Sequence, residues 1–420
     1  MKLSVLILTV AASMIHALYA RQNQGVYEIN CDSAFLKKPA SIVDIISTKN
    51  IVGLGEATHG THEFFTIKGE LIKSLVLTAK FKTIAFETDF SAFQVNEYLI
   101  GNSSDLAQVM TNFYLIYHTE EFVSLLRWLR DYNMSVSKEN QVLIFGYDSQ
   151  HVGNLPKMLI KYLEKVDPVY STECEPWLAE LQLELQPKFR DKYTQKLDLL
   201  AQRAAERKSS YLEHCSAQEY KFAFQMISRM KSAVIQSTMR NRHGTKSQTL
   251  RDAEMLENLK WIRKFTGDGK VIIWGHNGHI QTNKFILKNE DHFRMGEGLK
   301  EHFGTDYYAV GFDFGSGSFN AVNYQKDARM QPCFVSNTNE SSLSAQLKEV
   351  GLSCYFIDFS SLSENIKSKL SGVRYMREAG IGFSGEQFTF ARLDVASSFD
   401  AIVYVNQTNP TKFVDVRKLR

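Results

Sequence analysis

The sequence has 420 residues, of which 44% are hydrophobic and 12% aromatic. This composition supplies a sizeable folded core and excludes a disordered chain. The formal net charge is +3, from 49 basic and 46 acidic side chains, and no segment gathers the basic residues on one face. We therefore predict that the protein has no nucleic-acid partner.

Residues 1–20 have the pattern of a secretory signal peptide. Lys2 precedes a short apolar run, and small residues follow at Ala17 and Ala20. We therefore predict cleavage after Ala20 and a secreted or periplasmic protein. An uncleaved anchor is the alternative, but the run is short for a bilayer span, and we expect no stable membrane association after signal cleavage.

Five cysteines stand at positions 31, 174, 215, 333 and 354. In an exported protein they allow up to two disulfides with one thiol left over. Their spacing specifies no pairing and contains no paired metal-binding motif, so the pairing stays open.

The first part of the chain alternates between buried strands and amphipathic helices. A short helix at residues 40–47 leads to a strand at Ile51–Leu54, whose apolar, β-branched residues indicate burial on both faces. A helix at residues 63–79 has apolar side chains at three- and four-residue steps, and a second strand ends at Glu87. Strand, helix and strand in this order build a parallel sheet with a right-handed crossover.

A helix at residues 120–133 and a buried strand at residues 141–148 extend this pattern. The strand signal then disappears, and helical stretches rich in charged and amide side chains take its place. We therefore predict a helical insertion or cap at residues 154–248, between two parts of an α/β core at residues 21–153 and 249–420.

The second part of the core returns to the strand pattern. A helix at residues 250–265 precedes a buried strand at residues 270–274 and a further strand at residues 307–314. Residues 354–358 and 399–405 are predicted edge strands. The whole pattern predicts an α/β fold with a mostly parallel central sheet flanked by helices.

Side chains capable of proton chemistry follow several of these strands: Glu56 and His59, then Glu87, then Asp148, then His276, Asn277 and His279. Ligands of open α/β sheets bind outside the carboxyl ends of the strands, so these side chains are expected to share a cleft. The alternative for the first loop is that Glu56 caps the next helix and His59 is packed in the core.

This set of side chains suits hydrolysis of an ester by an activated water. A histidine takes a proton from water, a neighbouring carboxylate fixes its tautomer, and a second histidine or an amide stabilises the oxyanion. The G-x-S-x-G elbow of serine esterases is incomplete at residues 315–319 and 382–386, which we interpret as turns. The three-residue spacing of His59 and His62, and of His276 and His279, leaves a His and Glu metal site open as an alternative.

Several motifs, in order along the chain, resemble the erythromycin esterase family. They are GLGEATH at residues 53–59, TIAFE at 83–87, EEF at 120–122 with RWLR at 127–130, RD at 251–252 and WGHNGH at 274–279. The resemblance covers residues 51–404. The family is more distantly similar to TraB-like proteases and haem-binding proteins, which keeps a bound metal or a haem-like ligand open.

The resemblance implies hydrolysis of a cyclic ester, as in the opening of a macrolide lactone, on an α/β core with a helical cap. It also implies that His59 is the general base and that Glu56, Glu87, His276 and His279 line the same cleft. Lys68 stands where the family commonly has arginine. Lysine keeps the charge but loses the planar bidentate fork, so substrate positioning is expected to differ.

We therefore predict an esterase that acts on a small-molecule ester or lactone and needs no cofactor. His59 is the predicted base, Glu56 or Glu87 orients it, and His276 gives electrophilic support. The predicted substrate contacts are His279, Lys68, Asn277 and Arg251. The alternative for Arg251 is a salt bridge that holds the cap to the core, which is the more common role of an arginine at the start of a helix. Asp148 is expected to be structural.

Two other classes of function stay open. One is a hydrolase that holds a divalent metal in the same cleft, and the other is a non-catalytic binding protein for a haem-like ligand. The sequence specifies neither the substrate nor the oligomeric state.

Overall fold

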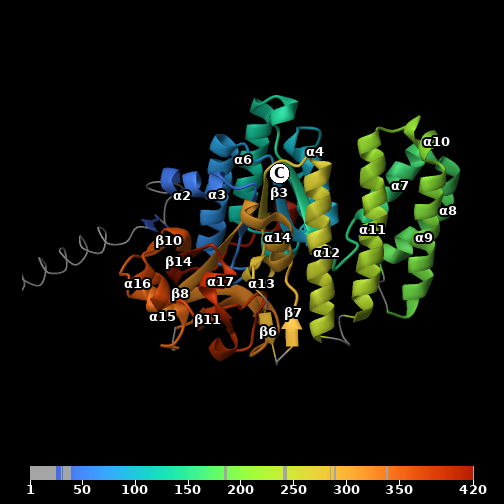
Figure 1. The fold of residues 1–420 in the computed structure, drawn as a ribbon. Helices are drawn as coiled ribbons and strands as arrows, with labels where there is room; N and C mark the ends of the chain where they lie inside the picture. The colour runs from blue at the N-terminus through green and yellow to red at the C-terminus, as the bar shows by residue number, and fades with distance from the viewer. Residues whose placement is uncertain are drawn as a thin grey trace, which may run out of the picture.

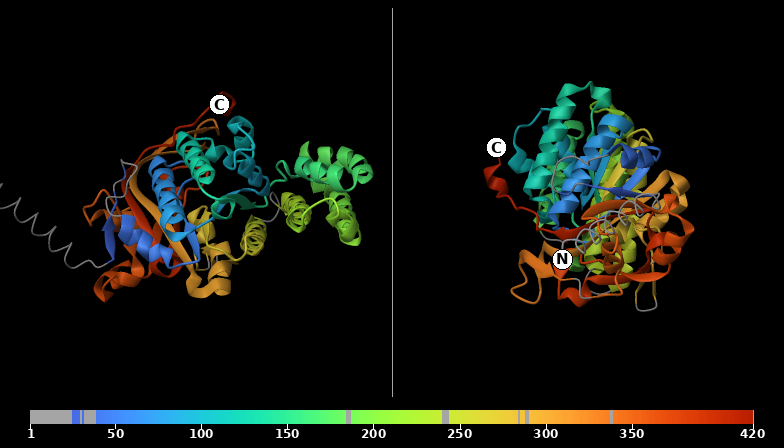
Figure 2. Two further views of the ribbon diagram at one scale, coloured as in Figure 1. Left: turned by 90° about the horizontal axis from the view of Figure 1, so that it is seen from above. Right: turned by 90° about the vertical axis from the view of Figure 1, so that its left-hand side faces the viewer.

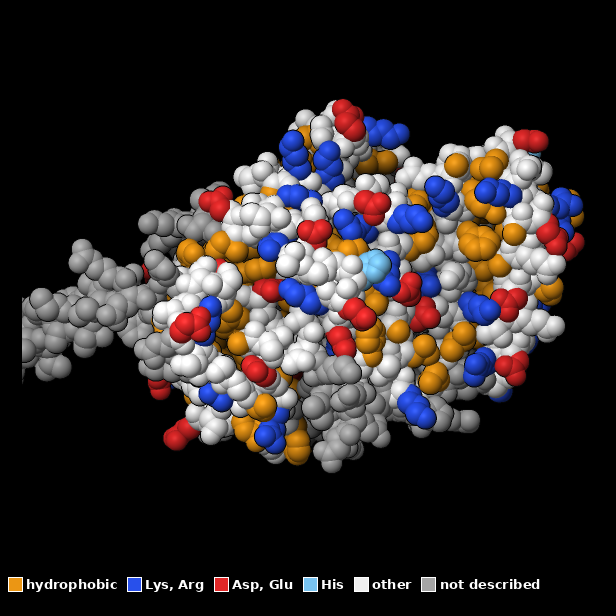
Figure 3. Space-filling view, viewed as in Figure 1, with side chains coloured by type: hydrophobic (Ala, Val, Ile, Leu, Met, Phe, Trp, Pro, Cys, Tyr) orange, Lys and Arg blue, Asp and Glu red, His pale blue; other side chains and the backbone are white. Residues whose placement is uncertain are grey.

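A computed structural model describes residues 25–29, 31, 39–183, 187–239, 244–283, 285–287, 290–336 and 339–419. The predicted signal peptide lies outside the described residues. A ten-stranded sheet crosses the molecule, with helices on both faces (Figure 1). Acidic and basic side chains are interspersed over the face seen in Figure 3. Within the described ranges, no helix combines the length and the apolar character needed to span a membrane.

Eight strands form the main path across the sheet. Their order is β1 (Val26–Glu28), β10 (Cys354–Asp358), β14 (Ala401–Thr408), β8 (Tyr307–Asn323), β2 (Ile51–Leu54), β5 (Val271–Trp274), β3 (Thr83–Asp89) and β4 (Leu143–Asp148). Every neighbouring pair from β14 to β4 is parallel, whereas β10 and β1 are antiparallel additions at one end. The prediction of a mostly parallel central sheet flanked by helices is confirmed.

Successive side chains of the central strands pack into different cores. Val52 of β2 packs with α3 (His62–Ala79) and α6 (Glu120–Ser135) on one face of the sheet. Its neighbour Ile51 packs on the other face with α12 (Gly244–Phe265). Strand side chains alternate between the two faces, so the apolar runs in the sequence reflect a sheet covered on both sides.

The two predicted edge strands lie farther inside the sheet than expected. β14 is buried between β8 and β10, and β10 is covered by β1. The short β1 provides this edge, and a disulfide joins Cys31 to Cys354 beside it, with Cα atoms 6.1 Å apart. The edge prediction is wrong because the order of strands depends on tertiary packing, which a local pattern does not contain.

Residues 315–319 belong to strand β8, so their interpretation as a turn is wrong. Gly317 has a φ of +127°, and a Cβ atom there would lie 2.3 Å from the carbonyl oxygen of Thr408 in β14. The glycine therefore permits the close approach of two backbones and not a reversal of the chain. Residues 382–386 begin with the short strand β12 (Gly382–Phe383), which pairs with β8 before the chain bends.

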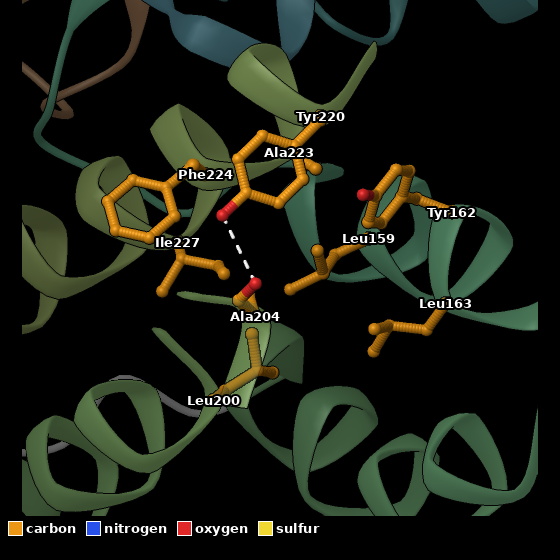
Figure 4. Close-up of a pocket in the computed structure, with 9 residues that line it drawn as sticks. All are labelled: Leu159, Tyr162, Leu163, Leu200, Ala204, Tyr220, Ala223, Phe224 and Ile227. Carbon is orange, nitrogen blue, oxygen red and sulfur yellow. Dashed lines mark hydrogen bonds between the residues drawn. The ribbon is translucent and has the colours of Figure 1, made fainter. Parts of the chain in front are cut away.

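The helices that follow β4 pack together beside α12 and project from the rest of the molecule (Figures 1 and 2). They are α7 (Leu155–Val166), α8 (Pro168–Leu183), α9 (Arg190–Glu206), α10 (Lys208–Leu212) and α11 (Ala217–Met239). A pocket of about 10 Å³ among them, lined by apolar side chains including Leu159, Leu200 and Ile227, has room for about one water molecule (Figure 4). The predicted boundary at residue 248 falls inside α12.

Candidate active site

A cleft of about 870 Å³ opens outside the carboxyl ends of the central parallel strands. Leu54 of β2 and Phe86 of β3 both pair with Trp274 of β5, so the loops that follow these strands meet at one edge of the sheet. The predicted site residues that line this cleft are His59, Glu87, Arg251, His276 and His279. The sheet therefore brings together side chains that are far apart in the sequence.

His59 and Glu56 form a hydrogen-bonded pair at the end of β2. Nδ1 of His59 lies 2.6 Å from Oε1 of Glu56, whose carboxylate is fully buried. Burial alone raises the pKa of Glu56, but Lys68 and His59 outweigh it and leave the pKa below its usual value. Burial alone lowers the pKa of His59, but the hydrogen bond and the charge of Glu56 leave it raised. Nδ1–H therefore donates to Glu56, and Nε2 keeps the lone pair that can accept a proton.

Lys68 does not line the cleft, so the prediction that it contacts substrate is wrong. Its side chain on α3 is fully shielded from solvent and pairs with Oε2 of Glu56, which also accepts a hydrogen bond from Nε1 of Trp274 at 3.0 Å. Burial lowers the pKa of Lys68 to about 8 although Glu56 opposes this shift. Lys68 acts through Glu56, because it stabilises the carboxylate that orients His59.

Arg251 on α12 joins the ends of β3 and β4. Its Nη2 donates to Glu87 at 2.7 Å and to Asp148 at 2.9 Å, and its Nη1 lies 2.8 Å from Nε2 of His279. Nδ1 of His279 lies 2.8 Å from Asp252, also on α12. Arg251 thus ties this helix to the sheet and also lines the cleft, while Asp148 serves as its buried partner.

Glu87 contacts Arg251 and not His59. Its Oε2 accepts a hydrogen bond from the backbone amide of His276 at 2.7 Å. Burial alone raises the pKa of Glu87, but His279, Arg251 and that amide outweigh it and hold the pKa well below its usual range. Of the two acids that were candidates to orient His59, Glu56 makes the contact, and Glu87 is a fixed negative charge nearby.

His276 lies across the cleft from His59, with ring centroids 5.2 Å apart. Its Nε2 lies 3.3 Å from the carbonyl oxygen of Ala57, and its Nδ1 accepts a hydrogen bond from the amide of Gly278 at 3.2 Å. Oε2 of Glu378 lies 3.1 Å from the same Nδ1. Burial lowers the pKa of His276 to about 3, so the ring is neutral at physiological pH.

Asn277 is buried beside the cleft and does not line it. Its Oδ1 accepts a hydrogen bond from the amide of Phe312 at 3.0 Å, and its Nδ2 donates to the carbonyl oxygen of Phe312 at 2.7 Å. These two bonds fasten α13 (Asn277–Ile280) to β8. The prediction of a substrate contact is wrong, because both polar atoms are used in holding the fold.

The cleft includes polar side chains that the sequence did not indicate: Tyr114, Gln150, His151, Arg294 and Glu378. The Tyr114 hydroxyl donates to Asp89 at 2.8 Å and to Asp148 at 3.2 Å. Glu378 follows β11 (Val373–Arg377), which belongs to a separate two-stranded sheet. Gln150 and His151 follow the buried strand β4, so the signal that identified the other site residues could also have found them, whereas Tyr114, Arg294 and Glu378 follow no strand of the main sheet.

The spacing of His59 and His62 does not produce a shared ligand set. His62 turns toward α6, where its Nδ1 lies 2.5 Å from Glu121. Among the described residues, no three His, Cys, Asp or Glu side chains are arranged to hold a metal ion.

The chain matches proteins of known family and structure over most of its length. The family model described as erythromycin esterase matches residues 76–408, a span that includes Glu87, Arg251 and His276. An erythromycin esterase type II from Escherichia coli is 23% identical, over 88% of this chain and 92% of that protein. A putative hydrolase, YbfO, from Bacillus subtilis is 23% identical, over 92% of this chain and 88% of that protein.

Solved structures share the fold. A Bacillus cereus protein superposes with a TM-score of 0.82 at 22% identity, covering 96% of this chain and 99% of that one. A mutant of the erythromycin esterase EreC, in its open conformation, gives a TM-score of 0.70 at 16% identity, covering 93% and 99%. The match to the family model spans more than half of the sequence, and the chain belongs to the erythromycin esterase family.

Proposed function

We propose that this protein hydrolyses a carboxylic ester or lactone with a water molecule activated by His59. The observation that carries the proposal is the His59–Glu56 pair, in which the buried carboxylate fixes the Nδ1–H tautomer and leaves Nε2 available to take a proton. The resulting hydroxide attacks the ester carbonyl. A histidine oriented by a carboxylate is the usual device for general-base catalysis of this kind.

His276 is the proposed support for the oxyanion that forms in this attack. Because Gly278 donates to Nδ1, the hydrogen of the neutral ring is on Nε2, where it makes only a 3.3 Å bond with the carbonyl oxygen of Ala57. A developing oxyanion is a stronger acceptor than a peptide carbonyl and can compete for this donor. The ring lines the cleft and faces His59, as this role requires.

The substrate proposed for this cleft is a small molecule with both apolar and polar parts. Leu115, Ile116, Ile381 and Phe390 contribute apolar lining, whereas the charged and imidazole groups gather near the strand ends. A volume of about 870 Å³ lies within the range of cavities that take drug-sized ligands. A macrolide is a candidate because a relative carries the name erythromycin esterase.

The test uses purified protein, a panel of aryl esters and a set of macrolides. We expect His59→Ala to lower kcat/KM about 10²–10⁴-fold, the usual contribution of a general base, while thermal unfolding stays cooperative. His62→Ala is a matched control, because His62 pairs with Glu121 outside the cleft. Equal activity of His59→Ala and the wild type would overturn the proposal. Metal analysis of the same samples tests the metal-dependent alternative, for which a stoichiometric ion lost on substitution of His59 or His276 would count.

A further inference from the structure

We propose that Glu378 is the catalytic acid that protonates the departing alcohol of the ester. This inference rests on the proposed ester hydrolysis and adds a second group to it, because an alkoxide is a poor leaving group until it gains a proton. Glu378 lines the cleft beside His276, across from His59.

Hydrogen-bond geometry assigns the proton to the Glu378 carboxyl group. The amide of Gly278 can only donate, so Nδ1 of His276, which it contacts at 3.2 Å, presents a lone pair. Oε2 of Glu378 lies 3.1 Å from the same nitrogen. An ionised carboxylate would bring a second lone pair against the first, whereas a carboxylic acid supplies the hydrogen that makes the contact favourable.

The surroundings of the other carboxyl oxygen, Oε1, also indicate that Glu378 is protonated. Oε1 of Glu378 is buried and has no hydrogen-bond partner among the described residues. An unpaired anionic oxygen is costly to bury, and a neutral carboxyl group is much less so. By contrast, the Glu56 carboxylate contacts Lys68, His59 and Trp274. The Glu56–His59 and Glu378–His276 pairs therefore differ, because the first contains a carboxylate and the second a carboxylic acid.

The surroundings of Glu378 also favour its protonated form, unlike those of Glu56. Burial raises the pKa of Glu378 to about 8, and Asp313 on β8 adds to the shift. Arg294, which precedes α14 (Met295–Phe303), and the amide of Gly278 oppose it without cancelling it. Two carboxyl groups whose environments drive their pKa values apart are the usual basis for separate acid and base roles.

The backbone fixes the acid to the loop that carries the base. The amide of Ala379 donates to the carbonyl oxygen of Ala57 at 2.8 Å, and the amide of His59 donates to the carbonyl oxygen of Gly380 at 3.2 Å. The amide of Glu378 itself donates to Thr389 at 2.7 Å. The two catalytic side chains therefore extend from adjacent, hydrogen-bonded segments, which suits a reaction that needs both at one substrate.

The proton balance of the reaction closes with these two groups. His59 takes a proton from water, and the hydroxide adds to the carbonyl carbon. The tetrahedral intermediate then collapses, the bond between that carbon and the alcohol oxygen breaks, and the Glu378 carboxyl group gives its proton to the oxygen. After the acid and alcohol leave, the His59 proton passes through solvent to Glu378 and restores the starting state.

The experiment compares two esters with the same acyl group, para-nitrophenyl butanoate and ethyl butanoate, in the wild type and in Glu378→Gln. Nitrophenolate leaves without protonation, whereas ethoxide needs a proton in order to leave. We expect Glu378→Gln to lower kcat/KM for the ethyl ester about 10²–10⁴-fold and to leave the nitrophenyl ester within the same decade. In the wild type, the ethyl ester rate is expected to fall above about pH 8, where Glu378 loses its proton, and the nitrophenyl rate is not.

Two controls separate this inference from the function on which it rests. Glu386→Gln removes a nearby carboxylate that pairs with Arg377 at 3.3 Å, and it should not change the ratio of the two rates. An equal loss on both esters in Glu378→Gln would overturn the acid role and leave the esterase proposal intact. Wild-type protein that hydrolyses neither ester would overturn both. In infrared difference spectra of wild type minus Glu378→Gln, a carboxylic-acid band at pH 7 supports the assignment, and a carboxylate band overturns it.

Discussion

The ammonium of Lys68 lies 3.9 Å from the centre of the Trp274 ring, and neither side chain reaches the cleft. The aromatic face of Trp274 and the Glu56 carboxylate both stabilise this cation, which has no exposed surface. Because the Glu56 carboxylate contacts both Lys68 and His59, the reactivity of the imidazole is expected to depend on a side chain that does not line the cleft.

Replacing Lys68 by Met is expected to lower both stability and activity. The substitution leaves the buried Glu56 carboxylate without its cation, and removal of one partner from a buried ion pair costs about 3–5 kcal/mol. Chemical denaturation measures the stability, and kcat/KM on the high-pH plateau, where His59 is unprotonated, measures the activity. Lys68→Arg keeps the charge and is the control. Unchanged stability of Lys68→Met would contradict the buried pair.

The pH dependence of activity is expected to respond to Glu56. The base must be unprotonated, so kcat/KM rises with pH through the raised pKa of His59. Glu56→Gln removes the group that raises this pKa, so the rising limb should move to lower pH. The plateau should fall on the order of 10²–10⁴-fold, because the imidazole loses its fixed tautomer. Glu121→Gln alters a similar pair outside the cleft and should leave the limb in place.

Acid stability is expected to depend on Glu87. Its pKa in the folded chain lies well below the ordinary value of 4.5. A carboxyl group of this kind contributes its full stabilisation above the unfolded pKa and loses it as the pH falls through the folded pKa. The free energy of unfolding of the wild type should therefore decrease below about pH 5. In Glu87→Gln this decrease should be shallower, and parallel curves for the two proteins would argue against the assignment.

The disulfide between Cys31 and Cys354 is expected to stabilise the edge of the sheet. Cys31→Ser should lower the free energy of unfolding by about 2–5 kcal/mol, measured without reductant. Cys215→Ser, which removes a free thiol, is the control and should change it little. Reductant should lower the Tm of Cys215→Ser, which keeps the disulfide, and not the Tm of Cys31→Ser. An equal response of the two variants would mean that the disulfide does not form in solution.

The sequence predicted the site best where an apolar strand ends in a polar loop. Glu56, His59, Glu87 and His276 were found in this way, since parallel strands deliver their carboxyl ends to one edge. The sequence pattern does not show how deeply a side chain is buried. Lys68 was therefore expected in the cleft, although it is buried and pairs with Glu56.

Asn277 and Glu378 illustrate two other limits. Asn277 follows the right strand, but its side chain is used by the backbone of β8, a partner more than thirty residues away that only the folded chain reveals. Glu378 follows a strand outside the main sheet, so no rule of strand ends applies to it. The order of β10 and β14 was also unreadable, because long connections between strands do not specify their neighbours.

The hydrogen bonds between residues 57–59 and 379–380 have a consequence for substrate range. They fix the spacing of the two proposed proton-transferring groups without the helices α7–α11, which contribute no residue to these hydrogen bonds or to the lining of the cleft. Substrate range is therefore expected to depend on lining side chains such as Leu115 and Phe390, which can change while the spacing of the two groups stays the same.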